Sequence, residues 1–141
     1  MKLGEFLSEQ GKLPQRDVER AVVARDERGG KFGQILVKLG LVSEIDVSNA
    51  LSQVLGIAQI RTEDYPEEPV TVPGLSLDFM LGNSVVPIEV SAQGALFSAV
   101  VPQDDFLKKA LALALDRPVA IHLGLESEVL AALQRHMEPA A

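Results

Sequence analysis

The chain has 141 residues, contains no cysteine and carries a formal net charge of −7. This length suits one compact domain or two small ones, and such a chain buries enough apolar surface to fold without a disulfide or a metal. The absence of cysteine excludes a disulfide framework and a thiolate nucleophile or metal ligand. The excess negative charge makes a nucleic-acid backbone an unfavourable partner.

The charge is distributed unevenly between the two halves. Residues 1–60 balance eight basic against eight acidic side chains, so the whole excess lies in residues 61–141, which hold five basic and twelve acidic side chains. We therefore expect any anionic ligand to bind the neutral first half. The sequence predicts neither a secretory signal nor a membrane-spanning segment.

The first half contains a repeat with a spacing of 29 residues. The segment Lys2–Leu7, followed by Gly11, matches the segment Lys31–Leu36, followed by Gly40, and the match continues from residues 17–22 to residues 46–51. Each copy predicts a short helix that ends at its glycine and a second helix that follows a turn. The first of these helices is expected over about 3–10. Pro14 is expected near the start of the second.

Periodicity disappears from Arg61 to Gly74, where three prolines lie among acidic residues. Proline stiffens the chain and withholds a backbone donor, so this stretch predicts a semi-extended linker. We therefore expect three parts. Residues 1–60 form a tandem helical repeat subdomain, residues 61–74 a linker, and residues 75–141 a small α/β subdomain.

The last part alternates helices and strands. A short helix is predicted over 75–81, strands over 85–90, 95–101 and 119–123, and a helix at the end. Pro87 places the first strand at an edge or a bulge. Between the second and third strands Asp104 caps a helix with apolar positions at Phe106, Leu107, Ala110, Leu111 and Ala114. A strand, a helix and a strand in this order predict a parallel crossover. The expected fold is α+β, with a three-stranded mixed sheet and flanking helices.

No residue pattern predicts catalysis. Gly30-Lys31 resembles the end of a phosphate loop, but Phe32 occupies the position where Ser or Thr would bind magnesium. His122 and His136 have neither a neighbouring nucleophile nor a metal-ligand spacing. Tyr65, the only tyrosine, is too isolated to form a stacking platform.

The starts of the two repeats suggest an anion site. Lys2-Leu3-Gly4 and Lys31-Phe32-Gly33 each place a helix start directly after a cation. The free N–H groups of a helix N-terminus beside a lysine can bind an anion, and two such sites suit a ligand with two phosphates. The simpler interpretation is that the glycines permit tight helix packing while the lysines are solvated. The residues alone favour the simpler interpretation.

At these residues the chain resembles the N-terminal domain of type II secretion and type IV pilus assembly ATPases. This family includes the GspE N-terminal and MshEN-like domains that bind cyclic di-GMP, and its members carry the tandem motif R-L-G-x-x-L-x-x-x-G. The resemblance covers nearly the whole chain. The positions that it implies for binding cyclic di-GMP are Lys2, Leu3, Gly4, Leu7, Gly11, Lys31, Phe32, Gly33, Leu36 and Gly40.

The resemblance also implies a second role. In this family the domain docks a motor onto a membrane-anchored partner of the secretion or pilus machine, from the cytoplasm and without inserting into the inner membrane itself. It implies no metal and no cofactor, apart from cyclic di-GMP as a ligand. The phosphate-loop ATPase core would be encoded downstream.

The chain departs from the family motif where the ligand would be held. Both motif arginines are lysines, and a lysine lacks the planar fork that grips a phosphate or stacks on a guanine. Each lost charged hydrogen bond would cost roughly 1.5–3 kcal/mol. The sequence therefore predicts a non-catalytic docking and regulatory module, or a stand-alone relative of one, which binds through apolar faces of the first-half helices. The alternative is a cyclic di-GMP sensor with a degenerate motif.

Overall fold

The computed structural model describes residues 3–28 and 32–137. They form two compact units, Met1–Ile57 and Ala58–Ala141. The predicted limits of 1–60, 61–74 and 75–141 stay a prediction.

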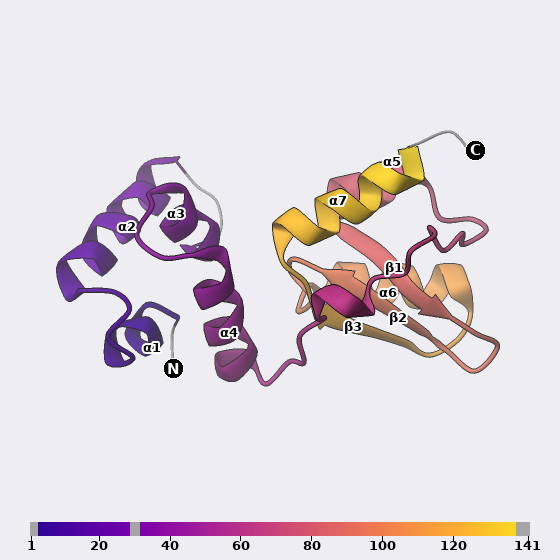
Figure 1. Ribbon diagram of the computed structural model, residues 1–141, viewed down its shortest axis with the longest axis horizontal. Helices are drawn as coiled ribbons and strands as arrows, with labels where there is room; N and C mark the ends of the chain where they lie inside the picture. The colour runs from indigo at the N-terminus through magenta and orange to yellow at the C-terminus, as the bar shows by residue number, and fades with distance from the viewer. Residues whose placement is uncertain (1–2, 29–31, 138–141) are drawn as a thin grey trace. The chain divides into compact units, whose positions relative to one another are not determined.

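The first unit consists of helices, as predicted (Figure 1). They are α1 (Leu3–Glu9), α2 (Gln15–Arg28), α3 (Phe32–Lys38) and α4 (Glu44–Leu55). Helix α1 packs on α4 and α2 packs on α3, so each repeat contacts the other. Ser43 caps α4 by accepting a hydrogen bond from Asp46 N at 3.1 Å.

The two repeats share their backbone geometry at equivalent positions. Gly11 and Gly40 have φ angles of +73° and +72°, a left-handed conformation that glycine adopts without strain. Equivalent hydrogen bonds close both helix ends. They are Lys12 N to Leu7 O and Leu41 N to Leu36 O, each 3.0 Å long. The repeat read from the sequence is therefore a structural repeat.

The second unit is a small mixed sheet with helices on both sides (Figure 1). The strand order is β1-β2-β3, with β1 antiparallel and β3 parallel to the central strand β2. The elements are a 3-10 turn η1 (Thr62–Asp64), α5 (Leu77–Asn83), β1 (Val85–Val90), β2 (Ala95–Ala99), α6 (Asp105–Leu115), β3 (Val119–Leu123) and α7 (Glu126–Met137). Pro87 lies in an edge strand at a register shift, so both predicted roles of this proline are confirmed.

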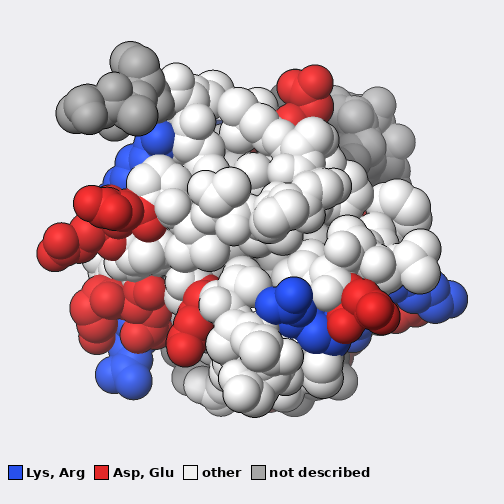
Figure 2. Space-filling view, turned by 90° about the vertical axis from the view of Figure 1, so that its right-hand side faces the viewer, with Lys and Arg blue, Asp and Glu red and all other residues white. Residues whose placement is uncertain are grey.

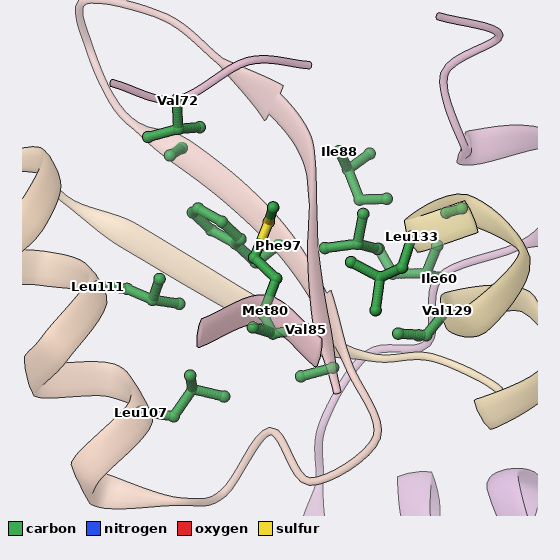
Figure 3. Close-up of a cluster of buried hydrophobic side chains, with 14 of the residues drawn as sticks. Ile60, Val72, Met80, Val85, Ile88, Phe97, Leu107, Leu111, Val129 and Leu133 are labelled. Atoms are coloured by element: carbon green, nitrogen blue, oxygen red, sulfur yellow. The ribbon is translucent and has the colours of Figure 1, made fainter. Parts of the chain in front are cut away.

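The core of the second unit lies around β2. Leu107 and Leu111 of α6 approach the sheet from one side, and Val129 and Leu133 of α7 approach it from the other (Figure 3). Phe97 of β2 is fully buried between these layers. Consecutive side chains of a strand point to opposite faces of the sheet, and helices cover both faces here. Two consecutive residues of β2, Phe97 and Ser98, are therefore both buried.

Residues 61–74 belong to the second unit and are anchored to the rest of it. The Tyr65 hydroxyl and the Ser98 Oγ are 2.8 Å apart in a hydrogen bond. Arg135 donates to the Pro66 carbonyl at 2.9 Å, and Val72 belongs to the core. The prolines give this stretch little periodicity, but these polar and apolar contacts hold it against the rest of the unit.

The apolar positions that the sequence gives for α6 do not all face the core. Leu107, Leu111 and Leu115 are buried, whereas Phe106 is 64% exposed. Only one side of a helix can contact a sheet, and Phe106 lies about 100° around the axis from Leu107. Phe106 is therefore a surface residue rather than a core residue.

Candidate functional site

The structure brings the starts of the two repeats together. Gly4 and Gly33 occupy the second position of α1 and of α3, and both are buried. A methyl group on Gly4 would lie 3.3 Å from the Phe32 ring, and one on Gly33 would lie 3.4 Å from the Leu3 Cδ2. Each glycine therefore faces the residue that precedes the glycine of the other repeat.

The same two glycines also contact the second helix of their own repeat. A Cβ on Gly4 would lie 3.1 Å from the Val18 Cγ1, and one on Gly33 would lie 2.8 Å from the Val47 Cγ1. Val18 and Val47 are equivalent positions, so the two environments are related by the repeat. This geometry gives both glycines a packing role, in agreement with the simpler interpretation.

The remaining positions assigned by resemblance are distributed over the unit. Leu7 and Leu36 lie in its core, at 1% and 0% exposure. Gly11 and Gly40 follow the opposite ends of α1 and α3 and are exposed turn residues. Leu3 and Phe32 are half-buried beside that core. Lys2 and Lys31 lie outside the described residues.

The charged groups of the described first unit form surface pairs. Lys12 Nζ and Asp46 Oδ1 are 3.9 Å apart, and Arg20 Nη1 and Asp17 Oδ1 are 3.4 Å apart. Exposed pairs of this kind contribute between about 0 and 1 kcal/mol to stability. The first pair joins the turn after α1 to α4, and the second lies within α2, so the two pairs do not form a cluster of catalytic groups.

The imidazoles of the second unit have structural surroundings. His122 is a half-buried residue of β3. Burial lowers the pKa of His136 on α7, and its Nε2 has no hydrogen-bond partner. Within residues 3–28 and 32–137, no three His, Asp or Glu side chains are grouped closely enough to hold a metal ion.

Comparison with known proteins places this architecture in a family. The sequence pattern of the MshEN domain family matches residues 55–141, which is more than half of the chain. The chain belongs to the MshEN domain family. The match lies over the second unit, where the sequence pattern alone was weaker than in the repeat.

Two curated relatives align with nearly all of this MshEN-family chain. It is 32% identical over 133 residues to the type II secretion system protein E of Xanthomonas campestris pv. campestris, with 91% of this chain and 23% of that protein covered. It is 32% identical over 126 residues to the type IV pilus assembly ATPase PilB of Thermus thermophilus, with 89% and 14% covered. The chain thus spans less than a quarter of either relative.

Two solved structures share the fold of the MshEN-family chain. The alignment with the N-terminal domain of XpsE has a TM-score of 0.78 at 31% identity, and it covers 94% of this chain and 92% of that domain's chain. The alignment with the structure of MshE with cdg, cyclic di-GMP, has a TM-score of 0.75 at 25% identity. It covers 96% of this chain and 98% of the MshE chain. The predicted family and the α+β fold are therefore both confirmed.

Proposed function

We propose that this MshEN-family chain is a non-catalytic docking and regulatory module of a type II secretion or type IV pilus ATPase, or a stand-alone relative of one. It binds a protein component of the machine at the inner membrane. It lies in the cytoplasm, where that partner holds it beside the inner membrane. Among the described residues, no helix combines the length and the hydrophobicity needed to cross a bilayer.

The observation that carries this proposal is the extent of the matches. The chain covers 92% of the XpsE N-terminal domain, but only 23% of a type II secretion protein E and 14% of a PilB ATPase. A unit of this size can fold alone and be attached to different motors. Its role is therefore that of a binding domain, and the ATPase chemistry belongs to other parts of those proteins.

We expect the full chain to bind at least one inner-membrane component of the secretion or pilus machine of its source bacterium. Each component is tested singly, by two-hybrid assay and by pull-down with purified cytoplasmic segments. The pull-down is repeated at protein concentrations above about 100 μM, because a dissociation constant of that size corresponds to a binding free energy of only about −5.5 kcal/mol. An absence of binding to every component would contradict the docking role.

Cyclic di-GMP binding is the second candidate. It is favoured by the likeness to MshE, which was solved with that ligand and aligns over 98% of its chain. The adjoining starts of α1 and α3 also bring Leu3, Gly4, Phe32 and Gly33 together. The two lysines that replace the motif arginines are expected to weaken binding, because they lack a bidentate fork.

We expect Lys2→Arg/Lys31→Arg to bind cyclic di-GMP more tightly than the unaltered chain, since the arginine fork adds charged hydrogen bonds. Titration calorimetry measures both proteins. No heat from either protein at ligand concentrations of about 100 μM, equivalent to a binding free energy weaker than about −5.5 kcal/mol, would remove this function. Lys12→Arg, an exposed lysine outside the implied set, is the matched control and should leave the affinity unchanged.

A further inference from the structure

The strand β3 (Val119–Leu123) forms one edge of the sheet, because the strand order is β1-β2-β3. The residues on either side of it show which backbone groups face the central strand. The Pro118 carbonyl accepts a hydrogen bond from Ala95 N at 2.9 Å, and Gly124 N donates to the Ala99 carbonyl at 2.9 Å. The even-numbered residues from 118 to 124 therefore direct their backbone groups toward β2.

The odd-numbered residues of β3 direct their backbone groups away from β2. Leu123 N donates to the Ala58 carbonyl at 2.8 Å, and the Leu123 carbonyl accepts from Ile60 N at 2.8 Å. Val119 and Ile121 face the same way, since alternate residues of a strand direct their N–H and C=O groups to the same edge. Among the residues that the structure describes, no backbone group outside the sheet pairs with these two residues. Residues 119–121 are called the open edge below.

The chain begins to cover this edge of the sheet and then stops. Gln59 and Leu123 form a parallel bridge, so residues 58–60 act as a short additional strand. The preceding residue does not extend it. Ile57 N donates to the Ser52 carbonyl at 3.1 Å, and the Ile57 carbonyl accepts from the Ser52 Oγ at 2.6 Å, which commits its backbone groups to the end of α4. The edge of β3 thus accepts a parallel strand, but the chain supplies one only beside Leu123.

The two edges of the sheet differ in how they are protected from pairing. At the β1 edge Pro87 withholds a backbone donor, and the register shifts between Pro87 and Glu89. Proline and bulges are devices that prevent an edge strand from pairing with another chain. The register of β3 with β2 is regular, and the open edge contains neither a proline nor a charged residue. It therefore keeps its capacity to pair.

The side chains of the open edge favour an apolar partner. In the register of the sheet Ile121 lies beside Phe97, so both side chains project from the same face. Val119 and Ile121 pack against the core of the unit and are half-buried, whereas Ala120 on the opposite face is exposed. A further strand would place an apolar side chain next to Ile121 and continue the row that begins at Phe97. It would place a small or polar side chain next to Ala120.

We propose that the open edge binds an extended, apolar segment of a partner protein, which adds a strand to the sheet. This inference rests on the proposed docking role and names its surface and the form of its partner. The N–H and C=O groups of Val119 and Ile121 supply the main-chain hydrogen bonds. Alternate apolar side chains of the segment contact these two residues and fix which of its faces meets the core.

Two other modes of recognition fit the open edge less well. In a pair of open edges, residues 58–60 of each copy of the chain would lie in line with β3 of the other copy and meet its Leu123 or its Arg117. The two copies would also each carry a net charge of −7. The side of the molecule in Figure 2 carries acidic and basic side chains interspersed among uncharged ones, whereas residues 119–121 carry no charge. Recognition at the open edge therefore depends on main-chain pairing and apolar contact.

The test uses the full chain and a labelled synthetic peptide of ~9 residues that alternates valine and threonine. Two N-methylated forms of the peptide are compared, each methylated at one of the two sets of alternate residues. Only one set directs its N–H groups toward β3. We expect one form to bind at least about tenfold more weakly than the unmethylated peptide, and the other to change by less than about threefold.

Val119→Pro tests the same contact from the side of the protein. It removes an outward N–H at the first residue of β3, where proline is tolerated, and leaves the pairing with β2 intact. We expect it to weaken binding of the unmethylated peptide by about fivefold. Val90→Pro is the matched control at the other edge, because Ser91 N donates to the Gly94 carbonyl and Val90 N–H points away from β2. It should change the affinity by less than about twofold.

Several results would overturn the proposal. These are an equal loss of binding for the two N-methylated forms, or an unchanged affinity in Val119→Pro when circular dichroism shows that this variant is folded. Self-association in sedimentation that Val119→Pro abolishes would identify a second copy as the occupant and would overturn it as well. If Val119→Pro is unfolded, the comparison of the two N-methylated peptides on the unaltered chain still decides.

The open edge and the docking role fail separately. If Val119→Pro still binds the machine component that the unaltered chain binds, the surface is wrong and the docking role stands. If the chain binds no such component but discriminates the two N-methylated peptides as expected, the docking role is wrong and the open edge stands.

Discussion

Replacing Gly124 by alanine is expected to destabilise the second unit by about 3 kcal/mol or more, through overpacking and the loss of a part-buried hydrogen bond. Gly124 follows β3 and is buried. A methyl group there would overlap the Ser98 Oγ and would lie 2.8 Å from the Tyr65 hydroxyl and 3.0 Å from the Val129 Cγ2. Ser98 is 0% exposed, so turning its hydroxyl away from the methyl group would take place inside the core and would break its hydrogen bond with Tyr65.

The readout is the fluorescence of Tyr65 during urea unfolding, because the chain has one tyrosine and no tryptophan. Gly82→Ala is the matched control, since Gly82 lies in α5 with nothing within 4 Å of an added Cβ. There alanine is expected to raise stability by up to about 1 kcal/mol through helix propensity. Equal unfolding midpoints for the two variants would contradict the packing argument.

A double substitution separates the steric overlap with Ser98 from other effects of Gly124→Ala. Ser98→Ala removes the oxygen that the new methyl group would overlap, at the expense of the Tyr65–Ser98 hydrogen bond, worth roughly 0.5–1.5 kcal/mol. In Ser98→Ala/Gly124→Ala the combined loss is therefore expected to be smaller than the sum of the two single losses. Additive losses would mean that Gly124 is required for a reason other than its contact with Ser98.

Local sequence signals predicted most elements of the fold. Short apolar runs bounded by turn residues predict the three strands, and their order with the helix between them predicts the β2–α6–β3 crossover. Helix α5 begins two residues later than predicted, because Ser76 accepts a hydrogen bond from Phe79 N at 3.0 Å and caps it.

Tertiary contacts account for what the sequence did not predict. The run Leu111–Leu115 alternates leucine and alanine, so apolar residues occur all around the end of α6 and only contact with the sheet selects the buried side. Tyr65 pairs with Ser98, 33 residues away. The repeat predicted equivalent surroundings for Gly4 and Gly33, but the contact of each glycine with the other repeat depends on how the helices pair.

The effect of Gly33→Ala on stability tests how the helices of the first unit pack against one another. Its Cβ would lie 2.8 Å from the Val47 Cγ1, closer than a Cβ atom normally approaches. Val47 is 7% exposed, and a valine in a helix has one strongly preferred rotamer, so the clash must be relieved by moving α3 away from α4. We expect a net destabilisation of about 2 kcal/mol, after allowing for the better helix propensity of alanine.

Gly4→Ala is the matched comparison at the equivalent position of the first repeat. There the added Cβ would lie 3.1 Å from the Val18 Cγ1, and the half-buried Val18 can shift by the few tenths of an ångström required. The expected loss is therefore below about 1 kcal/mol. Hydrogen exchange of peptides from α1 to α4 measures both variants, and a larger loss of protection in Gly4→Ala than in Gly33→Ala would contradict the contact geometry.

Shortening Val47 shows whether the clash itself causes the loss. Val47→Ala removes the methyl group that the new Cβ meets, at the expense of a buried contact worth roughly 1–2 kcal/mol. Gly33→Ala/Val47→Ala is then expected to be more stable than the sum of the single losses predicts. Because Gly33 also faces Leu3 at the start of the other repeat, restored protection of α1 in the double variant would show that one contact holds both repeats together. Unchanged protection of α1 in all three variants would instead mean that the repeats are held by the core leucines alone.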